Sequence, residues 1–268
     1  MSRSRLCENS IMTELSKHKP TERFSGLAEV YAKSRPSYPT QAIVFIVERC
    51  RLTAESTLID IGSGTGISSR LIAAQGPTVI GIEPNDDMRT QAENQSLDVE
   101  NVSYLKGTAE DTTLLDSVAD AVLCAQAFHW FDANTALNEF RRILKPGGWA
   151  VLMWNERDEH DQFTKRYGDL LRELPETKSV EVPRGAAGQA LLDSQLFHNQ
   201  ELKHYGNKQV VDMDGLIGRA FSASYAPKDK TSAEQFTEKL KQLFVEFQEN
   251  GSVSLIYETS VYVGQSSK

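Results

Sequence analysis

The sequence has few of the residues that build metal sites and disulfide frameworks. Its 268 residues include three cysteines and five histidines. The cysteines, Cys7, Cys50 and Cys124, are far apart and show no C-x-x-C spacing, and the histidines form no H-x-x-x-H pair or Cys/His cluster. The sequence therefore predicts no metal site, no disulfide framework, and thiols that stay reduced in the cytoplasm.

Long apolar runs and an excess of basic residues are also missing. Residues 1 to 20 lack the apolar core of a signal peptide, and no later stretch approaches the roughly 20 apolar residues of a membrane helix. The formal net charge is −8, with 37 acidic and 29 basic residues. Because nucleic acids attract basic surfaces, we expect no nucleic-acid partner. Because the apolar runs are too short, we also expect no membrane partner.

Strand and helix signals alternate along the first part of the chain. Short apolar runs that predict strands cover residues 57–61, 78–83, 102–106, 119–125 and 149–155, and helices are expected at 41–50, 67–75, 86–96 and 133–144. Asn85 and Asp132 stand at helix N-cap positions, as does Thr40. This rhythm predicts a parallel α/β sheet with helices on both faces.

The second part of the chain is more polar. We expect helices at 159–173, 187–197, 212–223 and 232–248, and strands at 201–211 and 253–263. Thr231 and Glu234 have the spacing of a capping box for the last of these helices. The final strand alternates apolar and polar residues, which predicts an antiparallel strand at or near an edge of the sheet.

The strongest local signal is a glycine-rich turn after the first predicted strand. Gly62, Gly64 and Gly66 follow Asp60, and Ile67 stands where a dinucleotide-binding G-x-G-x-x-G motif would need glycine. A carboxylate beside such a turn repels a pyrophosphate but can attract an ammonium group. Glu83 lies at the end of the next strand, where an acid can accept hydrogen bonds from ribose hydroxyls.

These residues resemble the class I S-adenosylmethionine (SAM)-dependent methyltransferases with a type 11 methyltransferase domain, and the small-molecule branch similar to trans-aconitate methyltransferase. Asp60 and the three glycines match the family's first motif, and Glu83 matches its ribose-binding acid. The resemblance implies further cofactor contacts from Tyr31, Arg35, Ala109, Glu110, Ala125 and Gln126. Arg35 would meet the cofactor carboxylate, Ala109 and Glu110 the adenine, and the start of the segment Ala125 to Asp132 the methionine part.

The resemblance also implies an architecture. We expect a Rossmann-like α/β fold with a mostly parallel seven-stranded sheet, an antiparallel C-terminal strand, helices on both faces, and cap elements from both ends of the chain. Residues 1–22 would form a flexible arm and residues 23–155 the SAM-binding core. Residues 156–268 would complete the sheet and form the substrate cap.

Methyl transfer from a sulfonium is an in-line displacement, so the protein mainly has to align the acceptor and exclude water. If the acceptor is a hydroxyl or an amine, His129 is the candidate general base. If the acceptor is a carboxylate, no base is required, and His129 would then only form part of the pocket wall. Arg184 and Arg219 could pair with an acidic substrate, although lone arginines are more often solvated surface charges.

The sequence thus predicts a methyltransferase that uses SAM to methylate a small-molecule acceptor, either a carboxylate or a hydroxyl. Two alternatives stay open. One is an NAD(P)-dependent oxidoreductase, against which Ile67 argues, and the other is a SAM-binding regulator without turnover. The acceptor and the oligomeric state do not follow from these residues.

Overall fold

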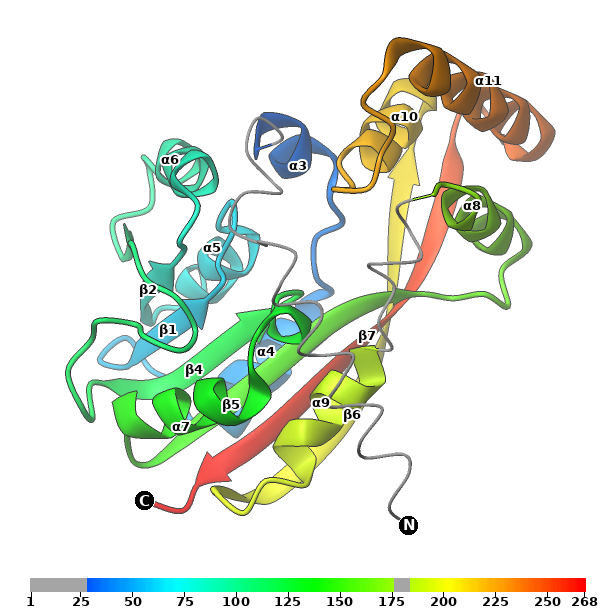
Figure 1. The fold of residues 1–268 in the computed structure, drawn as a ribbon. Coiled ribbons are helices and arrows are strands. Elements are labelled where there is room, and N and C mark those ends of the chain that lie inside the picture. The colour runs from blue at the N-terminus through cyan, green and yellow to red at the C-terminus, as the bar shows by residue number, and fades with distance from the viewer. Residues whose placement is uncertain (1–27, 176–183) are drawn as a thin grey trace.

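A computed structural model describes residues 28–175 and 184–268 and shows one seven-stranded sheet (Figure 1). The strands lie in the order β3-β2-β1-β4-β5-β7-β6. Their bounds are β1 Thr57–Ile61, β2 Thr78–Ile82, β3 Val102–Leu105, β4 Ala119–Ala125, β5 Leu144–Arg157, β6 Phe197–Val211 and β7 Val253–Ser266. β7 is antiparallel to both β5 and β6, and the pairs among β1 to β5 are parallel. The predicted α/β fold class is confirmed.

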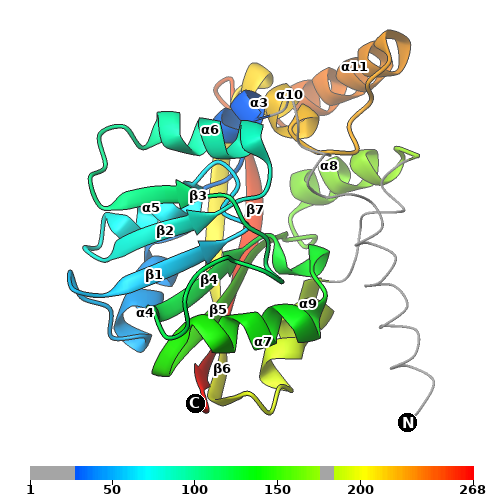
Figure 2. The ribbon, with the colours of Figure 1, turned by 60° about the vertical axis from the view of Figure 1, so that its left-hand side comes forward.

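Helices cover both faces of the sheet (Figure 2). One face carries α4 and α5, and the other carries α7 and α9. The helices are α3 Ala28–Ser34, α4 Thr40–Arg49, α5 Ile67–Ala73, α6 Asp86–Gln95, α7 Ala133–Ile143, α8 Gln162–Arg172, α9 Arg184–Leu192, α10 Met213–Phe221 and α11 Lys230–Phe247, with a short 3-10 turn at Phe128–Trp130. None of the helices in the described part of the chain is long and apolar enough to cross a membrane.

The strands are continuous apolar runs because both faces of the sheet are buried. Along β5, Ala150, Leu152 and Trp154 pack on the side of α7 and α9, whereas Val151 and Met153 pack on the side of α4 and α5. A central strand without polar positions can exist only between two helical layers. This arrangement explains why the predicted bounds of β1 and β4 agree with the observed ones.

Helix starts were predicted with mixed success. Asn85 accepts a hydrogen bond from the Met88 amide at 2.9 Å, and Asp132 accepts one from the Thr135 amide at 2.9 Å, so both predicted N-caps are confirmed. The Thr40 cap was wrong, because α4 begins at Thr40 itself after Pro39. The capping box of α11 was also wrong, since Asp229 accepts the bond from the Ser232 amide.

β6 and β7 extend beyond the other strands and carry a cap. Figure 1 shows α8, α10 and α11 near the far ends of these two long strands, with α3 beside α10. Leu255 and Tyr257 of β7 pack with these cap helices, whereas Val261 and Val263 pack against the layer of α4. β7 therefore runs from the sheet into the cap.

Two expected boundaries differ from the structure, and a third lies outside the described residues. Residues 145–148 lie between the helix expected at 133–144 and the strand expected at 149–155, but β5 begins at Leu144, directly after α7, with a register shift where it pairs with β4. The boundary expected after residue 155 falls inside β5. The expected arm over residues 1–22 lies outside the described residues.

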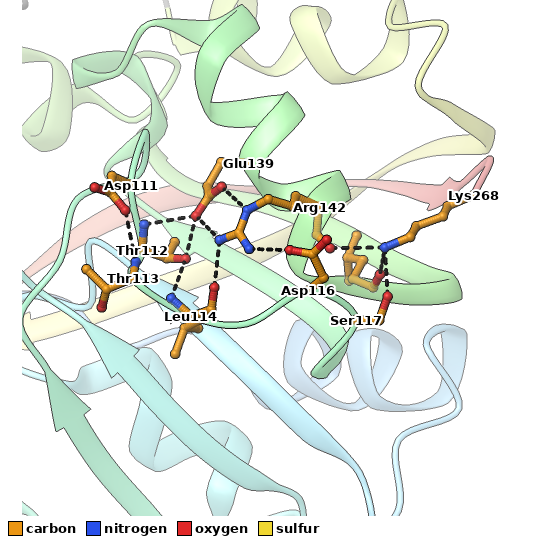
Figure 3. A network of polar contacts seen from close by, with 10 residues as sticks. Asp111, Thr112, Thr113, Leu114, Asp116, Ser117, Glu139, Arg142 and Lys268 are labelled. Atoms are coloured by element: carbon orange, nitrogen blue, oxygen red, sulfur yellow. Dashed lines mark hydrogen bonds and ion pairs between the residues drawn. The ribbon is translucent and has the colours of Figure 1, made fainter.

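A polar network fastens the loop after β3 to α7 (Figure 3). Glu139 accepts hydrogen bonds from the Thr112 amide, the Thr112 hydroxyl and the Arg142 guanidinium. Burial raises the pKa of Glu139, but these bonds outweigh it and lower the pKa to about 2. Arg142 also pairs with Asp116 at 2.6 Å. Both oxygens of the Glu139 carboxylate are thus used by the protein's own groups.

Candidate functional site

The glycine-rich turn joins β1 to α5 in a conformation that favours glycine. Gly62, Gly64 and Gly66 have φ values of 68°, 56° and 76°. A Cβ added to Gly62 would lie 2.7 Å from the Ala127 Cβ, so no side chain fits there. A Cβ on Gly64 would meet nothing within 4 Å. The backbone at Gly64 is therefore open to a ligand at the carboxyl end of β1, where open α/β sheets bind ligands.

Asp60 lies fully buried beneath this turn. Its Oδ2 accepts hydrogen bonds from the Ser68 hydroxyl at 2.7 Å and the Ser69 hydroxyl at 2.6 Å. Its Oδ1 is buried and has no hydrogen-bond partner among the described residues. Burial raises the pKa of Asp60 to about 6, although both serines act to lower it. Buried polar atoms are normally satisfied, so Oδ1 indicates a place for a ligand donor.

Two more unsatisfied atoms belong to the same turn. The hydroxyls of Ser63 and Thr65 are buried and have no hydrogen-bond partner in the described part of the chain. These two residues were not singled out from the sequence, because they stand at the x positions of the G-x-G-x-G spacing. The signal that could have found them is their small polar side chains in a turn that a ligand is expected to approach.

Glu83 connects the turn to the end of β2. Its Oε2 accepts a hydrogen bond from the Gly64 amide and its Oε1 one from the Asn85 amide, both at 2.9 Å. Burial raises the pKa of Glu83 against these bonds, which lower it. Each carboxylate oxygen has a second lone pair, so Glu83 can hold the turn in place and still accept from a ligand hydroxyl.

The residues predicted after β3 and β4 lie around the same edge of the sheet. Ala109 is buried, and Glu110 accepts a hydrogen bond from the Asp132 amide at 3.1 Å. Ala125 is the last residue of β4. Gln126 follows with a φ of 59°, a left-handed conformation that is costly for a residue with a side chain. Its side-chain amide donates to the Asn155 carbonyl at 3.2 Å.

The segment after α3 is tied to the sheet by side-chain amides. Asn155 and Asn207 both donate to the Ser37 carbonyl, and Gln209 donates to the Ser34 carbonyl. This places Arg35 with its guanidinium over the Tyr31 ring at 4.5 Å, donating to the Ser222 carbonyl at 3.1 Å.

A cavity lies between the end of the sheet and the cap. The described residues that line it are Tyr31, Arg35, Pro36, Tyr38, Ile67, Gln126, His129, Trp130, Asn155, Arg157, Arg219, Ser224, Tyr225 and Tyr257. Four of the predicted site residues line this cavity, namely those at 31, 35, 126 and 129. The other eight do not line it and lie at the turn or at the ends of β1, β2, β3 and β4.

Some of the lining residues were missed from the sequence. Tyr38, Asn155 and Tyr257 gave no signal, because each lies in or beside an element that could equally belong to the core. Arg219 was expected to be a solvated surface charge more often than a ligand, but it is 5% exposed.

His129 is buried in the 3-10 turn after β4 and contacts Trp154 from β5. The Trp154 Nε1–H donates to His129 Nδ1 at 3.3 Å. Since an indole nitrogen can only donate, Nδ1 must be the acceptor, and in the neutral imidazole Nε2 then carries the proton. The geometry favours His129 as a hydrogen-bond donor, and the predicted role as a general base stays a prediction.

Comparisons with known proteins agree on the family. A family model described as a methyltransferase domain matches residues 59–152. An uncharacterized methyltransferase of Mycobacterium tuberculosis is 35% identical over 153 residues, which are 55% of this chain and 58% of that protein. The chain therefore spans less than two thirds of this relative's length.

Two further comparisons cover more of the chain. The Saccharomyces cerevisiae protein CRG1, named a probable S-adenosylmethionine-dependent methyltransferase, is 30% identical over 213 residues, which are 76% of this chain and 68% of CRG1. A solved structure from Anaeromyxobacter dehalogenans, named a putative type II methyltransferase, matches with a TM-score of 0.64 at 22% identity, over 87% of this chain and 97% of the other. The latter supports the fold alone.

Proposed function

Because this chain belongs to the S-adenosylmethionine-dependent methyltransferases, we propose that it transfers a methyl group to a small-molecule acceptor bound in the cavity beneath the cap. The observation that carries this proposal is the buried, unpartnered Oδ1 of Asp60 beside a glycine turn that is open at Gly64. The two features suit a ligand with both an ammonium group and a nucleoside.

The residues of the turn fit SAM. Asp60 would hold the ammonium group, and the backbone of Gly62, Gly64 and Gly66 would lie along the ligand. When bound, SAM supplies a methyl carbon on a sulfonium. The proposed ribose contact is Glu83, the proposed adenine contacts are Ala109 and Glu110, and the proposed contacts to the methionine part are Tyr31, Arg35, Ala125 and Gln126.

The protein's own residues then have to position the acceptor and exclude water. We propose that the buried wall formed by His129 and the cap residues does this, and that His129 is the general base if the acceptor is a hydroxyl or an amine. His129→Ala should then lose most of its turnover with such an acceptor. Turnover of His129→Ala close to that of the wild type at every pH would leave His129 only as part of the pocket wall.

Several features support a small-molecule acceptor and a cytoplasmic location. The cavity lies beneath the cap, and Cys50 and Cys124 are free and buried. The resemblance to the branch of trans-aconitate methyltransferase supports the same substrate class. We therefore propose that the protein belongs to that branch and has no nucleic-acid partner.

Thermal unfolding with SAM, S-adenosylhomocysteine (SAH), NAD and NADP tests the cofactor. A ligand at about 100 times its Kd adds roughly 2.7 kcal/mol of stability, which moves Tm by several degrees. We expect a shift with SAM and SAH but none with NAD or NADP, and a loss of that shift in Glu83→Ala. The control Glu100→Ala changes an exposed glutamate and should behave like the wild type. A shift with NAD or NADP alone would favour the oxidoreductase.

Turnover separates an enzyme from a regulator that only binds SAM. Incubation with methyl-labelled SAM and pooled small molecules should yield labelled product and SAH. If the protein binds SAH tightly but gives no product with any acceptor class, the regulator is the better account.

A further inference from the structure

The cavity beneath the cap carries an unusual set of charges. Three arginines line it, Arg35, Arg157 and Arg219, and no aspartate or glutamate is among the described lining residues. This contrasts with the whole chain, in which acidic residues outnumber basic ones. Buried cations are normally paired, so Arg219, which is buried and has no carboxylate partner among the described residues, favours an anionic ligand.

Arg219 is the most deeply buried of these three arginines. It lies on α10, is 5% exposed, and takes part in no ion pair with a described residue. Its Nε is 3.4 Å from the Tyr257 hydroxyl, a long contact, and no described residue accepts a hydrogen bond from its two Nη groups. The surrounding groups are the tyrosine rings 167, 225 and 257. The planar fork of the guanidinium therefore has donors available.

A close approach of two helices brings Arg219 near Arg35. Gly218 precedes Arg219, and a Cβ at Gly218 would lie 2.7 Å from the Ser34 hydroxyl at the end of α3. Glycine at this position lets α10 pack directly against α3. Burial lowers the pKa of Arg35, and the positive charge of Arg219 lowers it further although Tyr31 opposes the shift. The fold thus holds two like charges together in one cavity.

We propose that Arg219 binds a carboxylate group of the methyl acceptor. This inference rests on the proposed methyltransferase function and names its substrate class. A carboxylate can take two parallel hydrogen bonds from one guanidinium, and it balances the charge of Arg219. SAM carries a carboxylate as well, so the same chemistry could come from either molecule. Arg35 lies on the segment assigned to SAM and would pair with the SAM carboxylate. Arg219 lies on the cap and would pair with the carboxylate of the acceptor.

The test measures binding to the full-length chain in two steps. SAH is first titrated into the wild type, Arg219→Met, Arg219→Lys and the control Arg166→Met, whose arginine is exposed and pairs with Glu246. The SAH-saturated proteins are then titrated with mono-, di- and tricarboxylates from acetate to citrate, and with the corresponding amides. We expect the wild type and Arg166→Met to bind at least one carboxylate at least tenfold more tightly than its amide.

The variants at position 219 separate the two sources of the carboxylate. Arg219→Met should bind SAH within about twofold of the wild type and lose the preference for the carboxylate, because a charge-assisted bond contributes about tenfold or more. Arg219→Lys should recover part of the preference. The inference is overturned if the wild type prefers no carboxylate over its amide, if Arg219→Met keeps the preference, or if its main effect is weaker SAH binding. Failure of the wild type to bind SAH at all would instead contradict the proposed function.

Discussion

Two buried carboxylates in this protein have opposite environments. Glu139 accepts bonds to both oxygens from Thr112 and Arg142, and its pKa falls to about 2. Asp60 receives two serine hydroxyls on Oδ2 and none on Oδ1, and burial raises its pKa to about 6. The first carboxylate is satisfied by its own chain, as a structural group should be. The second is satisfied only in part, and we propose that a ligand completes it.

The largest effect is expected for Asp60→Asn on ligand affinity. Asparagine keeps an acceptor for the serine hydroxyls but loses the charge that would attract the ammonium group of SAH. Hydrogen bonds to charged groups contribute about 1.5 to 3 kcal/mol, so we expect SAH to bind about 10- to 100-fold more weakly by calorimetry. The free energy of unfolding without ligand should not fall at neutral pH, because the ionised carboxylate is a buried charge that is satisfied only in part. A large loss of stability with normal affinity would make Asp60 a structural residue.

Glu139→Gln should show the reverse pattern. The change leaves Arg142 without its buried partner, and we expect the free energy of unfolding to fall by about 2 kcal/mol in urea titrations. SAH affinity should stay within about twofold of the wild type. Equal loss of affinity in both variants would mean that the network in Figure 3 belongs to the binding site, contrary to the comparison.

The two carboxylates should also dominate different pH ranges in the protein without ligand. The pKa of Glu139 is depressed, so its contribution to stability is present above about pH 4.5 and is lost as the pH falls toward 2. The pKa of Asp60 is raised, so its contribution is present below about pH 4 and is lost as the pH rises through 6. Across each of these two pH ranges the free energy of unfolding should change by about 1 to 3 kcal/mol. When unfolding is measured between pH 2 and 7, the change at the higher pH range should be absent in Asp60→Asn, and the change at the lower pH range should be absent in Glu139→Gln.

The smallest effect concerns the backbone of the turn. Alanine at Gly64 meets no atoms within 4 Å but must adopt a φ of 56°, which costs about 1 kcal/mol. Gly251→Ala is a matched control, because it also has a positive φ and open space but lies between α11 and β7. Both variants should lose similar stability, and only Gly64→Ala should weaken SAH binding, by severalfold. Equal SAH affinity in the two variants would place the ligand away from Gly64.

The same contrast shows what the sequence could predict. The strand–glycine–helix pattern at Asp60 to Gly66 and the apolar runs of β1 and β4 carry their own structure, because buried parallel strands leave few alternatives. The caps of α4 and α11 were missed, because α4 begins at Thr40 without any side-chain cap, whereas α11 has several polar residues near its start and Asp229 is the one that caps it. The environment of Arg219 could not be predicted, because its neighbours Arg35 and Tyr257 come from distant positions and meet only when α3, α10 and β7 pack together.

The most direct test of the account is a crystal structure of the protein with SAH. We predict that the amino group of SAH lies within hydrogen-bond distance of Asp60 Oδ1 and that the ligand lies along the protein backbone of Gly62 to Gly66. If SAH binds with its amino group elsewhere and Asp60 Oδ1 remains without a ligand contact, the assignment of the cofactor site is contradicted.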